Sequence, residues 1–150
     1  MIIDLIKKLL NRLSVNDLGL GDIVDLIGPV NSGAGTGSQI ELHSAHNEIQ
    51  SATLDLYPET GAPYLLTIKP AGDVLLTVSM LKPFLGEYHK ARIDFDKRPI
   101  VFFNPQNMGT QWQVVVFVEL EFEPAELDSV KVHSLFFRRD YLEKSLSGNV

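Results

Sequence analysis

The side chains best suited to acid–base chemistry lie together after Gly86. Glu87, Tyr88 and His89 supply a carboxylate, a phenol and an imidazole, groups that act as general acids and bases. Consecutive side chains point in different directions, however, so three neighbours rarely converge on one substrate. No serine lies in a G-x-S-x-G elbow, the setting of an activated hydrolase nucleophile. We therefore identify no catalytic residue, and the sequence favours a protein that is not an enzyme.

Two pairs of residues have the spacing of metal ligands. His43 and His46 form an HxxH pair, but the pattern places His43 in a strand and His46 in the turn after it. Asp94 and Asp96 alternate with apolar residues, which puts both carboxylates on the outer side of a strand, and two cations follow them directly. Surface histidines and a solvated strand edge explain both pairs, so we expect no metal site.

The glycines at positions 33, 35 and 37 resemble a phosphate-binding loop only superficially. Such a loop follows a strand and opens a helix, whereas this segment follows a helical stretch and precedes an alternating strand. No lysine or arginine occurs between Arg12 and Lys69 to contact a phosphate. Residues 31–39 are therefore interpreted as a flexible linker, and no cofactor is expected.

Acidic residues are segregated from basic ones along the chain. Two stretches contain carboxylates and no lysine or arginine, namely 14–67, with Asp17, Asp22, Asp25, Glu41, Glu48, Asp55 and Glu59, and 118–129, with Glu119, Glu121, Glu123, Glu126 and Asp128. Like charges on one strand face repel each other and are not selected for stability. They either keep the protein soluble and protect strand edges, or form a docking surface for a basic partner.

The composition of the chain excludes several classes of site and argues against some classes of partner. The 150 residues carry 13 basic and 19 acidic side chains, a formal net charge of −6, and no cysteine. Disulfides, thiol nucleophiles and cysteine-ligated metals are therefore excluded. The acidic balance argues against nucleic-acid binding. No apolar run is long enough for an export signal or a membrane span, so we expect a cytoplasmic protein without membrane contact.

Helical periodicity is confined to the first thirty residues. From Ile2 to Leu13 every apolar residue falls on one side of a helical wheel and every polar residue on the other, which predicts an amphipathic helix. A second helical stretch has apolar residues from Leu18 to Ile27, with Ser14, Asn16 or Asp17 available as N-caps, and ends at Gly28-Pro29.

From Ser38 onward the hydrophobic period changes to two, which indicates strands. The candidates are Ser38–Ala45, Glu48–Tyr57, Tyr64–Lys69, Val74–Met80, Ala91–Asp96, Ile100–Phe103, Gln111–Glu123 and Ser129–Phe137. Short turns join them, and short connections favour antiparallel neighbours. In the longest candidate, Val115 and Phe117 lie on the face that ends in carboxylates, so something must cover them. We expect the N-terminal helix to do so.

These patterns predict an α+β fold, with N-terminal amphipathic helices packed on a curved antiparallel sheet of about six to eight strands. The alternative is an all-β barrel or sandwich with a helical appendage. We expect a single domain over 1–150, divided into a helical segment (1–30), a Gly-rich linker (31–39), an antiparallel sheet (40–137) and a C-terminal tail (138–150).

The charge pattern leads to a functional hypothesis. We expect a non-catalytic, acidic protein-binding module, in its concrete form an inhibitor or immunity-type protein that docks a basic, nuclease-like partner. Its expected contacts are Glu119, Glu121, Glu123, Glu126 and Asp128, with Asp22 and Asp25 as secondary contacts. The alternative is a small-ligand-binding β-cup or an enzyme of unknown reaction, based on the many aromatic residues of the later strands. Self-association through an apolar patch is compatible with either.

Overall fold

The computed structural model describes residues 2–31, 38–91, 98–107, 109–121 and 129–142. Within them the chain forms three helices and seven strands. The helices are α1 (Ile2–Leu13), α2 (Leu20–Ile27) and α3 (Val78–Leu85). The strands are β1 (Gln39–Leu42), β2 (Ile49–Leu56), β3 (Pro63–Pro70), β4 (Tyr88–Lys90), β5 (Ile100–Phe103), β6 (Trp112–Leu120) and β7 (Val132–Tyr141). No helix among these residues is long and apolar enough to cross a membrane.

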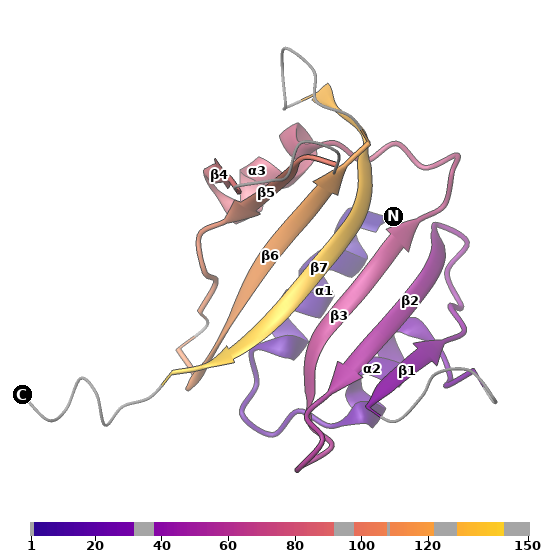
Figure 1. Cartoon of the computed structure of the whole chain (residues 1–150), viewed down its shortest axis with the longest axis vertical. Coiled ribbons are helices and arrows are strands. Elements are labelled where there is room, and N and C mark those ends of the chain that lie inside the picture. Colours follow the sequence, from indigo (N-terminus) through magenta and orange to yellow (C-terminus); the bar gives the residue numbers. More distant parts are fainter. Residues whose placement is uncertain (1, 32–37, 92–97, 108, 122–128, 143–150) are drawn as a thin grey trace, which may run out of the picture.

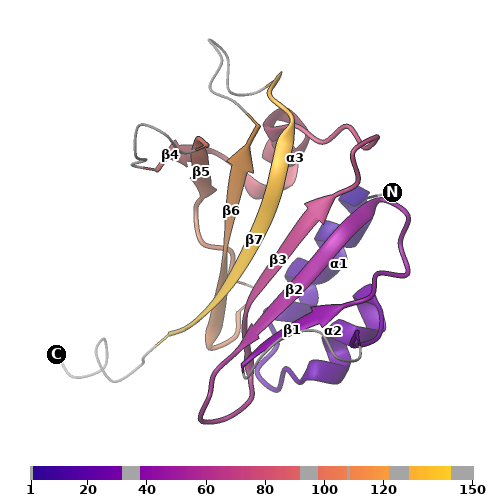
Figure 2. The same ribbon diagram turned by 45° about the vertical axis from the view of Figure 1, so that its right-hand side comes forward.

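The strands form one antiparallel sheet in the order β1-β2-β3-β7-β6-β5-β4. The sheet is twisted and open, with α1 and α2 lying behind it (Figure 1; Figure 2). The α+β prediction, with N-terminal helices on a curved antiparallel sheet, is confirmed. The barrel alternative is wrong, because β1 and β4 stay at opposite edges of the sheet instead of pairing.

Helix α1 forms where the sequence predicts it, because its apolar side chains share one side. The residues buried on that side are Ile2, Leu5, Ile6, Leu9, Leu10 and Leu13. Burying each such side chain contributes roughly 1.5–3 kcal/mol, which fixes the helix against the sheet. Figure 1 shows α1 behind β3 and β7, so it covers the middle of the sheet.

Helix α2 begins later than the sequence suggested. Its N-cap is Gly19, not Ser14, Asn16 or Asp17, and the Asp22 carboxylate accepts a hydrogen bond from the Gly19 backbone N–H at 2.9 Å. At its end Gly28 has a φ of 150°, and a Cβ there would lie 1.9 Å from the carbonyl oxygen of His43. Only glycine allows the segment after α2 to run this close to the segment that follows β1.

One predicted strand does not form, and part of the predicted C-terminal tail belongs to a strand. Val74–Met80 was expected as a strand, but Thr77 is an N-cap and α3 follows it. Alternation ends there because the buried Val78, Leu81 and Leu85 recur with helical spacing. At the C-terminus β7 continues to Tyr141, into the segment expected as a tail.

The helices cover the face of β6 opposite to the one we predicted. Val114, Val116 and Val118 lie on the helix side and are fully buried, whereas Val115 and Phe117 lie on the other side. The reason is the register. Val115 pairs with Arg138 and Phe117 with Phe136, while Val114 pairs with the buried Arg139, whose side chain reaches α1. Cross-strand neighbours decide which face is apolar enough to bury.

The largest fully buried side chain among the described residues is a cation, Arg139 on β7. Its guanidinium donates to the backbone carbonyls of Leu13 at 2.8 Å, of Val15, and of Asn16 at 3.3 Å, just after the end of α1. It also stacks 3.7 Å from the centre of the Trp112 ring. Burial lowers the pKa of Arg139, and the nearby Tyr57 opposes this effect. The planar guanidinium thus satisfies carbonyls that the helix end leaves free.

Removing this guanidinium should destabilise the fold. In Arg139→Met the carbonyls at the end of α1 lose their donors in a buried place, and we expect the free energy of unfolding to fall by roughly 3 kcal/mol or more. Arg12→Met makes the same chemical change at an exposed residue of α1, whose pairing with Asp22 at 3.7 Å is worth about 0–1 kcal/mol. Urea unfolding of both variants measures the difference, and equal losses would contradict the capping role of Arg139.

Candidate functional site

The predicted contacts Glu119 and Glu121 lie at the carboxyl end of β6, at the top of Figure 1. The Glu119 carboxylate is 2.9 Å from His133 Nδ1, and the Glu121 carboxylate is 3.9 Å from Lys131 Nζ. Their side chains are 25% and 40% exposed. Each acid therefore has a cationic or ionisable neighbour on β7 or next to it. This local pairing reduces the negative charge that the sequence pattern alone implied.

Lys131 brings a further segment to this end of the sheet. Its ammonium donates to the Gly72 carbonyl oxygen, and the Val132 N–H donates to the Leu76 carbonyl oxygen at 2.8 Å. The chain between these contacts carries the exposed Asp73 and Leu75, and Leu75 is 68% exposed, the highest value among the large hydrophobic residues described. We call Asp73, Leu75 and Glu121 the Leu75 surface.

Sequence reasoning missed Leu75 as a surface residue. It lies between the apolar Val74 and Leu76 in the segment predicted as a strand, and nothing in that run of three apolar residues marks it as exposed. The signal available was Pro70–Asp73, a turn directly before it. The carboxylates Glu123, Glu126 and Asp128 of the predicted set lie outside the described residues.

The secondary contacts Asp22 and Asp25 lie on another part of the molecule. Both belong to α2, near the bottom of Figure 1, far from the end of β6. Asp22 accepts the Gly19 N–H and lies 3.7 Å from Arg12, so its carboxylate serves the start of the helix. Asp25 is exposed. Among the described residues, the secondary contacts Asp22 and Asp25 therefore lie apart from Glu119 and Glu121.

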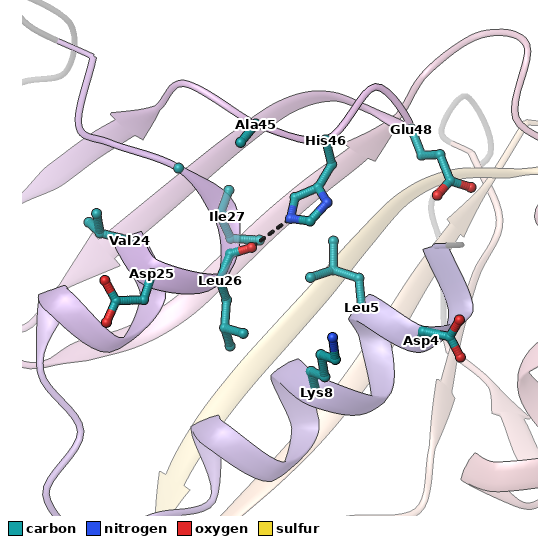
Figure 3. Close-up of a pocket in the computed structure, with 11 residues that line it drawn as sticks. Asp4, Leu5, Lys8, Val24, Asp25, Leu26, Ile27, Ala45, His46 and Glu48 are labelled. Carbon is teal, nitrogen blue, oxygen red and sulfur yellow. Dashed lines mark hydrogen bonds between the residues drawn. The ribbon is translucent and has the colours of Figure 1, made fainter.

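Asp25 borders a groove of about 520 Å³ between α1, α2 and the segment after β1. Figure 3 shows the lining, in which Asp4, Asp25 and Glu48 come from three elements and Lys8 lies among them. His46 Nε2 donates to the Leu26 carbonyl oxygen at 2.7 Å, which satisfies a carbonyl near the end of α2. In the described part of the chain no group of three or more His, Cys, Asp or Glu side chains could hold a metal.

The acid–base candidates do not converge. Tyr88 and His89 are neighbours in β4, so their side chains leave opposite faces of the sheet. The Tyr88 ring packs edge-on against the buried Phe103, 6.1 Å between centres, while His89 Nε2 lies 2.8 Å from the Asn104 side-chain oxygen. The glycines at 33, 35 and 37 and the Asp94–Asp96 pair lie outside the described residues.

The face of the sheet away from α1 and α2 has an unexpected feature. His89, Phe102, Phe117 and Phe136 follow one another across β4, β5, β6 and β7 as register partners. Ring centres are 5.2 Å apart for His89 and Phe102 and 6.0 Å apart for Phe102 and Phe117. We call this line the aromatic row, and the face that carries it the open face. Among the described residues no helix lies on it (Figure 1; Figure 2).

No protein-family model, curated protein or solved structure matches the chain. Its function therefore has to be argued from the side chains that the fold brings together.

The two acids of α2 should differ in what they do. Asp22→Ala removes the acceptor at the start of α2, so we expect the free energy of unfolding to fall by about 1 kcal/mol. Asp25→Ala, on the exposed side of the same helix, should change it by less than about 0.5 kcal/mol. Urea titration with circular dichroism measures both. A larger loss for Asp25 than for Asp22 would contradict these assignments.

Proposed function

We propose that the protein is a non-catalytic protein-binding module that docks a basic partner through the Leu75 surface. In its concrete form it is an inhibitor or immunity-type protein that covers the cationic site of a nuclease-like partner in the cytoplasm. The observation that carries the proposal is the exposure of Leu75 in the segment that Lys131 links, through the Gly72 carbonyl, to the carboxylate of Glu121. An apolar anchor within a charged rim is the usual plan of a protein interface.

Charge favours a basic partner over an acidic one. Glu119 and Glu121 are followed along the chain by Glu123, Glu126 and Asp128, and no lysine or arginine occurs from 118 to 129. Complementary charge speeds the encounter of two proteins and fixes their orientation. A site that attracts phosphate also attracts carboxylates, which is why a nuclease-like surface is a suitable partner.

The neighbouring cations do not prevent this docking. Glu121 lies 3.9 Å from Lys131, longer than a hydrogen bond, so its oxygens can accept from an incoming lysine or arginine. Glu119 is held more closely by His133, at 2.9 Å, and contributes less to this surface. Asp25 remains a candidate for a separate, secondary contact, whereas the carboxylate of Asp22 is used within α2.

The groove beside α2 favours a second candidate function, binding of a small ligand. The space between the sheet and α1 is filled by core side chains such as Ile6 and Leu9, so the cup expected from the curved sheet is occupied. A ligand would have to use the groove itself. Its carboxylates outnumber its one lysine, which suits a small cationic compound.

The partner can be identified and the surface tested in two steps. Native mass spectrometry of the protein, purified at low salt from its source cells, reveals a stoichiometric basic protein that dissociates as salt rises. Calorimetric titration with that purified protein should then show a loss of about tenfold or more in affinity for Glu121→Lys, because an attraction becomes a repulsion. Leu75→Ser should weaken binding by a similar factor through lost apolar burial.

Glu59→Lys is the matched control, since Glu59 is exposed in the turn between β2 and β3, at the other end of β3. It should keep its affinity within about twofold. Equal losses for Glu121→Lys and Glu59→Lys would mean that net charge, not the Leu75 surface, governs binding. A bound small cation and no protein partner would favour the groove instead.

A further inference from the structure

The open face of the sheet is apolar at its centre. Phe102, Phe117 and Phe136 of the aromatic row are half-buried, so part of each ring still meets solvent. Ile100 and Leu65 flank the row and are half-buried as well. Natural sheets either keep an uncovered face polar or pack it against another layer. A row of rings across four strands is therefore a surface built for contact.

Opposite charges border the two long sides of this row. Glu119 follows Phe117 by two residues on β6, and Arg138 follows Phe136 by two residues on β7, so all four side chains share the open face. Because β6 and β7 are antiparallel, those two steps run in opposite directions. Glu119 thus lies on one side of the row and Arg138 on the other. The register confirms this, since Glu119 pairs with Ser134 and Arg138 with Val115.

Both charges are held in place by a neighbouring side chain and are partly exposed. The Asp140 carboxylate holds the Arg138 guanidinium through hydrogen bonds of 3.0 and 3.2 Å to its Nε, and the guanidinium carbon lies 5.0 Å from the centre of the Phe117 ring. The Arg138 side chain is 47% exposed. The Glu119 side chain, beside His133, is 25% exposed. Part of each side chain therefore still meets solvent.

We propose that a second copy of this chain covers the open face, so that the protein is a homodimer with its two sheets packed face to face. A two-fold axis along the aromatic row, between the sheets, superimposes the two rows and turns the strands of the second copy end for end. The Glu119 side of one copy then lies over the Arg138 side of the other. Glu119 faces Val115 of the second copy, one strand or about 4.8 Å away from its Arg138, within reach of a guanidinium.

The charge arrangement favours this occupant over an unrelated one. A basic partner would meet Arg138 and an acidic partner would meet Glu119, each with a repulsion on one side of the row. A second copy in the two-fold arrangement meets an attraction on both sides, because the Glu119–Arg138 contact is made twice. Neither Leu75 nor Glu121 takes part in the proposed contacts between the two copies, so the dimer does not rest on the proposed basic partner.

Sedimentation equilibrium of the full chain over a concentration series tests the dimer. The wild type is a dimer that dissociates on dilution. Glu119→Arg and Arg138→Glu each place like charges opposite one another twice and weaken the dimer by about tenfold or more. Glu59→Arg, the same change outside the open face, leaves it unaltered. Circular dichroism and urea midpoints establish that each variant is folded.

Mixing the two charge variants gives the decisive result. In an equimolar mixture, the Glu119→Arg variant has arginine at both positions and the Arg138→Glu variant has glutamate at both. Each contact across the interface then joins an arginine to a glutamate, so a heterodimer forms. Mass spectrometry distinguishes it from either homodimer. A wild type that stays monomeric overturns the proposal. So do charge variants that remain dimeric, which would place the interface elsewhere, and a mixture that stays monomeric, which would exclude this two-fold arrangement.

Discussion

The buried guanidinium of Arg139 is the contact on which the arrangement of the fold depends. It joins β7, the strand between the two halves of the sheet, to the end of α1 through the carbonyls of Leu13, Val15 and Asn16. Neighbouring contacts reinforce this junction, since the Thr110 hydroxyl donates to the Ser14 carbonyl and the Asn16 side chain accepts the Gln111 N–H. The helix is therefore anchored at one end by polar bonds and along its length by apolar packing.

This anchoring decides which face of the sheet is covered. Because Arg139 points toward α1, its neighbours Arg138 and Asp140 in β7 must point the other way. The same alternation sends Trp112 and Val114 toward the helix and Val115 and Phe117 away from it. The alternation that turns Arg139 toward α1 therefore also places the aromatic row on the opposite face of the sheet. That face is apolar and can pack against a further layer.

The two proposals concern different parts of the molecule. The basic partner docks on the Leu75 surface near the end of β6, and the second copy docks on the open face of the sheet. The Leu75 surface arises because Lys131 contacts both the segment after β3, which carries the exposed Leu75, and Glu121 after the end of β6. The open face arises from strand alternation. Charge has different roles in the two. At the Leu75 surface it is mostly negative and selects a partner by its sign, whereas on the open face it is balanced across the row and selects a copy by its arrangement.

Helix α1, most of the strands and the antiparallel α+β class could be predicted from the sequence alone, because they follow from periodicities of 3.6 and 2 within single segments. The sequence also shows that carboxylates gather in two stretches. The contact of Asp22 with Arg12, and the pairing of Glu119 with His133 and of Glu121 with Lys131, depend on how distant segments meet in the fold. The covered face of β6 was likewise undecided, since both of its faces are apolar at the middle of the strand. Pairing register sets those outcomes, and register joins residues far apart in the chain that no local pattern relates.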